Sequence, residues 1–143
     1  MAIERVAVIG AGTMGAGIAQ VCAQAGWTTA LYDAFPEGLE RGMQRIDAFW
    51  DKGIARGKTT AEQKEAWAKN LRAESDMKTA VQDADLVIEA VPEILEIKAR
   101  IFHVLSIETK EDCILATNTS SLSISDIAQA SDRPDKVIGM HFF

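Results

Sequence analysis

The sequence predicts an α/β protein with a mostly parallel sheet that is covered by helices on both faces. Three observations lead to this class. Short apolar runs alternate with helical stretches along the chain, as they do in parallel sheets. A glycine-rich turn separates the first apolar run from the first helix. The chain has 143 residues, 48% hydrophobic and 25% charged, which is typical of one globular domain.

The first half of the chain is expected to supply two strands and three helices. Residues 5–10 form a short apolar run that ends in glycine, which is typical of a buried parallel strand. A helix over 13–25 follows, and its predicted apolar face consists of Ile18, Val21, Cys22 and Ala25. Residues 28–33 favour a second strand. Two further helices are predicted over 36–55, where Pro36 suits the first turn, and over about 60–71, where Thr60 can cap the helix.

The second half alternates in the same way. Strands are predicted over 85–91, 113–118 and 136–143, with helices over 94–107 and 123–130 between them. The two helices over 36–71 lack an intervening strand, so they form a helical insertion in the alternation. The whole pattern indicates a doubly wound sheet.

Composition excludes several classes of protein. The net charge is −6 and the isoelectric point about 4.9, so no general affinity for nucleic acid is expected. Two distant cysteines, Cys22 and Cys113, indicate neither a disulfide scaffold nor a metal site. No apolar run approaches the length of a membrane-spanning helix and no secretory signal pattern is present, so we expect no membrane partner and a cytoplasmic location.

The strongest local signal is a complete GxGxxG motif between the first strand and the first helix. Gly10 allows the tight turn, Gly12 lets the backbone approach a pyrophosphate, and Gly15 lets the helix pack close to the strand. Asp33 follows Gly15 at the spacing that this motif requires of its acidic residue, at the end of the second predicted strand. The motif therefore predicts a Rossmann-type dinucleotide site; the alternative is a glycine-rich turn followed by a surface aspartate.

Asp33 also indicates which dinucleotide binds. A carboxylate at this position can accept hydrogen bonds from both hydroxyls of the adenosine ribose, and it repels a 2′-phosphate. The next three residues carry no cation, and the first basic residue downstream is Arg41. NAD is therefore favoured over NADP.

Two histidines limit the choices for acid–base chemistry. His103 falls within a predicted helix, where a surface position is the simplest interpretation. His141 and Ser120 both follow predicted strands, and ligands of open α/β sheets bind outside the carboxyl ends of strands. An imidazole there can take a hydroxyl proton as hydride leaves for a nicotinamide. From the residues alone, a histidine that only packs at the strand end is an equal alternative.

Five motifs in order resemble the L-3-hydroxyacyl-CoA dehydrogenase family, specifically its N-terminal domain. They are GAGTMGAGIA, the strand end at Asp33, DLVIEAVPE with Lys98, NTSSL and GMHFF. The resemblance covers the whole chain. It implies that NAD is the cofactor, that an (S)-3-hydroxyacyl-CoA is oxidised to a 3-oxoacyl-CoA, and that the full-length enzyme is a homodimer.

The resemblance also implies roles for individual residues. His141 matches the catalytic base, and Ser120 matches a serine near the 3-oxygen of the substrate and the nicotinamide. The matching cofactor contacts are Gly10, Gly12, Thr13, Met14, Gly15, Asp33, Val91, Pro92, Glu93, Lys98 and Ser120. Pro92 departs from the aliphatic residue often seen there, although a backbone contact tolerates it. Arg56 is the closest positional match to the insertion that contacts coenzyme A.

The residues also allow other interpretations of the site and of the function. Without the family pattern, Glu93 is an ordinary acid at a helix start and Lys98 a solvated helix lysine. An NAD-dependent dehydrogenase of a hydroxy acid without coenzyme A, or a non-catalytic NAD-binding protein, would share the fold. We also expect residues 1–143 to be one domain of a longer two-domain enzyme, because the family continues with a helical domain.

Overall fold

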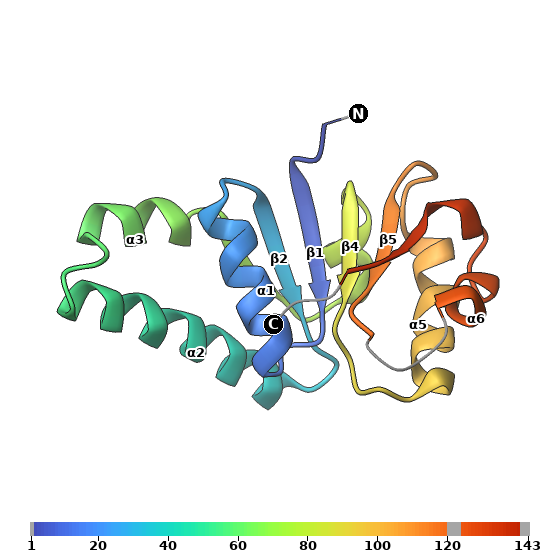
Figure 1. Ribbon diagram of the computed structural model, residues 1–143, viewed down its shortest axis with the longest axis horizontal. Helices are drawn as coiled ribbons and strands as arrows, with labels where there is room; N and C mark the ends of the chain where they lie inside the picture. Colours follow the sequence, from blue (N-terminus) through green and yellow to red (C-terminus); the bar gives the residue numbers. More distant parts are fainter. Residues whose placement is uncertain (1, 120–123, 141–143) are drawn as a thin grey trace.

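Over residues 2–119 and 124–140, which the computed structural model describes, the chain forms a six-stranded sheet with strand order β3-β2-β1-β4-β5-β6 (Figure 1). All five strand pairs are parallel. The strands are β1 (Arg5–Ile9), β2 (Thr28–Tyr32), β3 (Leu71–Glu74), β4 (Leu86–Glu89), β5 (Ile114–Thr117) and β6 (Val137–Gly139). This order confirms the predicted Rossmann-type doubly wound sheet.

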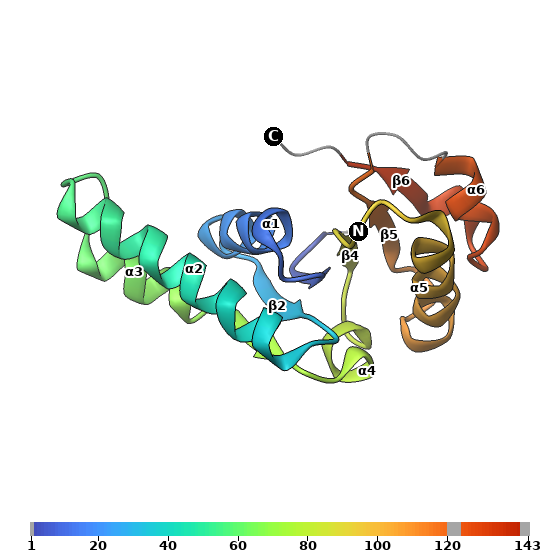
Figure 2. The same cartoon turned by 90° about the horizontal axis from the view of Figure 1, so that it is seen from below.

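Helices cover both faces of the sheet, as the view from below shows (Figure 2). They are α1 (Thr13–Gln24), α2 (Pro36–Ala55), α3 (Ala61–Ala68), α4 (Met77–Val81), α5 (Leu95–Glu108) and α6 (Ile124–Gln129), with a short 3₁₀ helix, η1 (Pro134–Lys136). Successive residues of β1 alternate between two cores. Val6 and Val8 pack with α1 and α2, whereas Ala7 and Ile9 pack with α4, α5 and α6.

The helical insertion is a hairpin of α2 and α3 that extends past the β3 edge of the sheet (Figure 1). A capping box starts α3: the Thr60 hydroxyl accepts from the Gln63 backbone N–H, and the Gln63 side chain accepts from the Thr60 N–H. Trp50 is buried, and its ring lies 5.8 Å from that of Trp67. This contact ties the two helices together, so the predicted insertion is confirmed.

The structure corrects three expectations. The helix predicted to reach residue 71 ends at Ala68, and Leu71–Glu74 is a four-residue edge strand with no fully buried residue. The last strand ends at Gly139. On α1, Val21 and Ala25 are exposed. Ile18 and Cys22 are buried as predicted, and the rest of the buried face consists of small residues such as Ala19 and Ala23.

Candidate functional site

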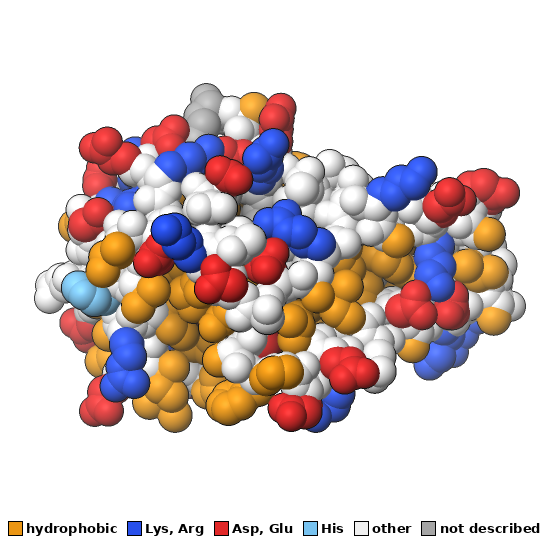
Figure 3. Space-filling view, turned by 180° about the vertical axis from the view of Figure 1, so that it is seen from behind, with side chains coloured by type: hydrophobic (Ala, Val, Ile, Leu, Met, Phe, Trp, Pro, Cys, Tyr) orange, Lys and Arg blue, Asp and Glu red, His pale blue; other side chains and the backbone are white. Residues whose placement is uncertain are grey.

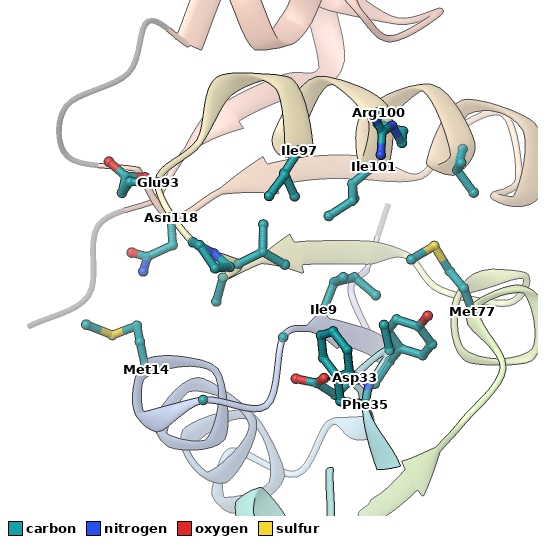
Figure 4. A pocket seen from close by; sticks show the side chains of 18 of the residues that line it. Ile9, Met14, Asp33, Phe35, Met77, Glu93, Ile97, Arg100, Ile101 and Asn118 are labelled. Carbon is teal, nitrogen blue, oxygen red and sulfur yellow. Dashed lines mark hydrogen bonds between the residues drawn. The ribbon is translucent and has the colours of Figure 1, made fainter. Parts of the chain in front are cut away.

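A cleft of about 830 Å³ opens at the carboxyl ends of the strands, above the join between β1 and β4. The strand order reverses at this join, which is where doubly wound sheets bind their ligands. Apolar side chains gather in the lower half of the face seen in Figure 3, which is the side of the strand carboxyl ends. In Figure 4, Met14, Asn118 and Glu93 lie toward one end of the cleft, and Asp33, Phe35 and Met77 lie toward the other.

The glycine-rich turn forms the floor of the cleft. Gly10 has a φ of +106°, and a Cβ there would lie 2.7 Å from the Ala90 carbonyl oxygen. A Cβ on Gly15 would lie 1.6 Å from the Gly10 carbonyl oxygen, so α1 can start here only with glycine. A Cβ on Gly12 would meet no atom within 4 Å. The backbone at Gly12 therefore faces open space, where a pyrophosphate can approach the first N–H groups of α1.

Asp33 is held in place beside this turn. One carboxylate oxygen, Oδ2, accepts a 2.8 Å hydrogen bond from the Ala11 N–H, and Oδ1 accepts a 2.9 Å bond from the Phe35 N–H. Each carboxylate oxygen can accept a second hydrogen bond. A half-buried, pre-oriented carboxylate that keeps this capacity suits a pair of ribose hydroxyls.

A buried ion pair lies beneath the opposite wall. The Lys98 Nζ lies 2.6 Å from Oε2 of Glu89, and both side chains have 0% exposure. Glu89 stands at the end of β4 and Lys98 near the start of α5, so the pair ties the strand to the helix that follows it. The interpretation of Lys98 as a solvated lysine is therefore wrong.

The same network orients the turn between β4 and α5. Lys98 Nζ also lies 3.2 Å from Oε1 of Glu93, and it donates to the Val91 carbonyl oxygen at 3.3 Å. Glu89 accepts from the Val91 N–H at 2.8 Å and from the Thr117 hydroxyl at 2.6 Å. The wall of the cleft at Val91–Glu93 is thus fixed from below by groups that do not themselves line the cleft.

A second charged group joins the strands at their opposite ends. Asp85, just before β4, accepts hydrogen bonds from the Glu4 and Arg5 N–H groups and from the Lys110 ammonium. These contacts, of which the Lys110 hydrogen bond has the largest effect, lower the pKa of Asp85 from 3.8 to about 2.

Inside the cleft, the pKa of Tyr32 is raised above its ordinary value, mainly by burial and then by the charges of Asp33 and Asp76.

Most of the predicted cofactor residues come together at this cleft. Those that line it are Gly10, Gly12, Thr13, Met14, Asp33, Val91, Pro92 and Glu93. Gly15 and Lys98 support the lining residues from behind. Arg56 is exposed at the end of α2 and does not line the cleft. Ser120 and His141 lie outside the described residues.

Sequence reasoning missed several lining residues. Asn118 directly follows β5, so its strand-end position was a usable signal. On α5, Ile97, Ile101 and Val104 face the cleft at helical spacing, whereas Phe35 and Met77 follow no local pattern. Glu89 also had a signal, because a charged residue inside an apolar strand needs a partner.

The comparison with known proteins decides the family. The family model of the 3-hydroxyacyl-CoA dehydrogenase NAD binding domain matches residues 5–143. The chain belongs to this family. NAD is accordingly the cofactor of the domain, and the turn at Gly12 and the Asp33 carboxylate fit it.

Two curated relatives carry the names of dehydrogenases that act on 3-hydroxyacyl-CoA compounds. The chain is 45% identical over 141 residues to 3-hydroxyadipyl-CoA dehydrogenase of Escherichia coli, covering 99% of the chain and 30% of that relative. It is 39% identical to the probable 3-hydroxybutyryl-CoA dehydrogenase of Bacillus subtilis, covering 99% of the chain and 49% of that relative. The crystal structure of Mycobacterium tuberculosis FadB2 superposes with a TM-score of 0.96 at 37% identity, over 100% of this chain and 50% of that one.

The chain thus spans between about a third and a half of the length of these family members. No helix among the described residues is long and apolar enough to cross a membrane.

Proposed function

We propose that this chain supplies the NAD-binding part of an NAD-dependent (S)-3-hydroxyacyl-CoA dehydrogenase. The reaction moves a hydride from carbon 3 of the substrate to NAD and releases the hydroxyl proton, giving a 3-oxoacyl-CoA and NADH. The observation that carries the proposal is the cleft over β1 and β4, where the glycine-rich turn faces Asp33 in a member of this family.

Different residues of the chain bind different parts of the NAD molecule. The N–H groups at the start of α1 receive the pyrophosphate, and Asp33 accepts hydrogen bonds from the adenosine ribose. The turn at Val91–Glu93 lines the nicotinamide half, held by the Glu89–Lys98 pair. When bound, NAD supplies the hydride acceptor. The apolar residues of α5 that line the cleft limit the access of water to it.

In this proposal His141 removes the 3-hydroxyl proton while Ser120 orients the 3-oxygen. The family resemblance supports these roles, and so do the neighbouring residues. Thr119 donates from its hydroxyl to Glu93 Oε2 at 2.9 Å, and the Met140 N–H donates to the Thr117 carbonyl oxygen at 2.9 Å. Both neighbours belong to the carboxyl edge of the sheet, beside the proposed nicotinamide end.

Three further assignments complete the proposal. Arg56, exposed on the α2–α3 hairpin, contacts the phosphates of coenzyme A. The whole gene product is a homodimer, which light scattering tests. It works in the cytoplasm, in keeping with the two buried free thiols, Cys22 and Cys113.

Initial rates of NADH formation test the activity. The whole gene product is assayed with NAD and either (S)-3-hydroxybutyryl-CoA or free (S)-3-hydroxybutyrate, and the 143-residue chain is assayed alongside it. We expect turnover of the thioester by the whole product, and NAD binding with little turnover by the chain alone. Turnover of the free acid but not of the thioester would identify a dehydrogenase without coenzyme A. Absence of both activities despite NAD binding would indicate a non-catalytic protein.

A further inference from the structure

A second, smaller pocket of about 300 Å³ adjoins Asp33 on the side of α2. Four of its lining residues, Gly12, Thr13, Asp33 and Phe35, also line the large cleft, so the two spaces meet at the carboxylate. The remaining walls are Ala11 of the glycine-rich turn and Gly38, Arg41 and Arg45 of α2. The pocket thus extends the proposed dinucleotide site past the adenosine ribose.

The packing of α2 explains why two arginines reach this place. Gly38, Arg41 and Arg45 are spaced to share one face of the helix. The helix lies so close to the turn that a Cβ on Gly42 would stand 2.7 Å from the Ala11 carbonyl oxygen. A Cβ on Gly38 would likewise stand 3.3 Å from Oδ1 of Asp33. The first two turns of α2 are therefore pressed against the glycine-rich turn, and the arginines flank that contact.

The charges in the pocket favour a phosphate. Among the described residues that line it, Asp33 is the only acid. Both arginines are exposed, and neither forms an ion pair of 4.0 Å or less with any residue in the described part of the chain. Two guanidinium groups at one rim suit a phosphomonoester dianion, which accepts bidentate hydrogen bonds. The opposing charge within this lining is the Asp33 carboxylate.

We propose that Arg41 and Arg45 form a subsite for the 2′-phosphate of NADP, and that the Asp33 carboxylate weakens phosphate binding there by charge repulsion. The inference rests on the proposed placement of the adenosine ribose at Asp33, because a phosphate on the 2′-hydroxyl would then point past that carboxylate. Preference for NAD in this chain is accordingly due to one carboxylate acting against two nearby cations. Although Arg41 is not adjacent to Asp33 in the sequence, α2 brings it to the same pocket.

Titration calorimetry on the whole gene product tests the subsite. The unmutated chain should bind NAD more tightly than NADP. Asp33→Ala should weaken NAD binding and strengthen NADP binding, so that the preference for NAD over NADP narrows or reverses. Adding Arg41→Ala and Arg45→Ala to Asp33→Ala should then weaken NADP by about tenfold or more and change NAD by less than about twofold. The matched control adds Lys52→Ala and Lys69→Ala to Asp33→Ala, which removes the same charge away from the pocket and should change neither affinity.

Further binding measurements distinguish the ways in which the proposed subsite could be wrong. Asp33 also accepts two backbone hydrogen bonds, so replacing it can disturb the turn as well as remove a charge. The Arg41→Ala/Arg45→Ala variant is therefore also measured with Asp33 in place, where it should weaken NADP binding and leave NAD binding unchanged. Equal loss of NADP affinity in the lysine control would show a general charge effect and overturn the subsite. Inorganic phosphate binding to the arginines as tightly as adenosine 2′,5′-bisphosphate would make the pocket a general anion site, which also overturns it. Unchanged NAD binding in Asp33→Ala would instead refute the ribose placement.

Discussion

Replacing Lys98 by methionine tests the buried ion pair most directly. Methionine has a similar length and no charge, so the substitution removes the ammonium with little change in packing volume. Glu89, with 0% exposure, then keeps only the Thr117 hydroxyl and the Val91 N–H as hydrogen-bond donors within the described part of the chain. Its carboxylate is left in the core without a counter-charge, which is among the most destabilising changes that a single substitution can cause.

The size of the effect follows from this geometry. Breaking a fully buried pair by removing one partner costs about 3–5 kcal/mol. Unfolding entropy of about 2.1 cal/mol/K per residue gives about 0.3 kcal/mol/K for 143 residues, so a loss of about 4 kcal/mol lowers Tm by about 13 °C. Differential scanning calorimetry at pH 7 measures this shift. Lys69→Met is the matched control, because its ion pair with Glu65 is exposed and should be worth about 0.5 kcal/mol or less.

A double variant decides whether charge is the cause. Glu89→Gln/Lys98→Met has no buried charge at the pair, and the glutamine carbonyl can still accept one of the two hydrogen bonds. We expect it to recover at least about half of the stability that Lys98→Met loses. A double variant no more stable than Lys98→Met would show that lost packing, rather than an unpaired carboxylate, causes the destabilisation.

Three other predictions concern catalysis, acid stability and thiol reactivity. In the whole gene product, His141→Ala should lower kcat by about 100-fold or more with NAD affinity unchanged; near-normal turnover would mean that another group is the base. The pKa of Asp85 is lowered to about 2, so its stabilisation is complete above its ordinary pKa of 3.8 and is lost as the pH falls toward 2. Asp85→Asn should lower Tm at pH 7 and reduce the fall in Tm between these pH values, and an unchanged profile would contradict this. Burial raises the pKa of both cysteine thiols to about 11, so about one in a thousand is ionised at pH 8. A disulfide reagent should label them only after denaturation, and rapid labelling of the native chain would refute the burial.

Features that depend on a few neighbouring residues could be predicted from the sequence, whereas features that depend on contacts between distant segments could not. The glycine-rich turn and Asp33 were predictable because each role follows from a few neighbouring residues and a fixed spacing. The burial of Lys98 was not, because its partner Glu89 lies on the preceding strand and a helix lysine is usually solvated. The position of Arg41 beside Asp33 depends on how closely α2 packs at Gly42, which no local pattern encodes. The short strand β3 was missed because four residues of alternating character, shortly after a helix, are too short to indicate a strand.

The position of β1 also has a consequence for the order in which the chain folds. Val6 pairs with Thr29 of β2, which is the next strand along the chain, and with Leu86 of β4, which is separated from it by two strands and four helices. Loop-closure entropy makes the longer contact less favourable by about 1 kcal/mol, so we expect the β1–α1–β2 unit to form before β4 docks. The cleft lies over the β1–β4 join, and its two walls therefore meet only at the later step. Dinucleotide binding should thus develop late during refolding, on the time scale on which β4 docks against β1.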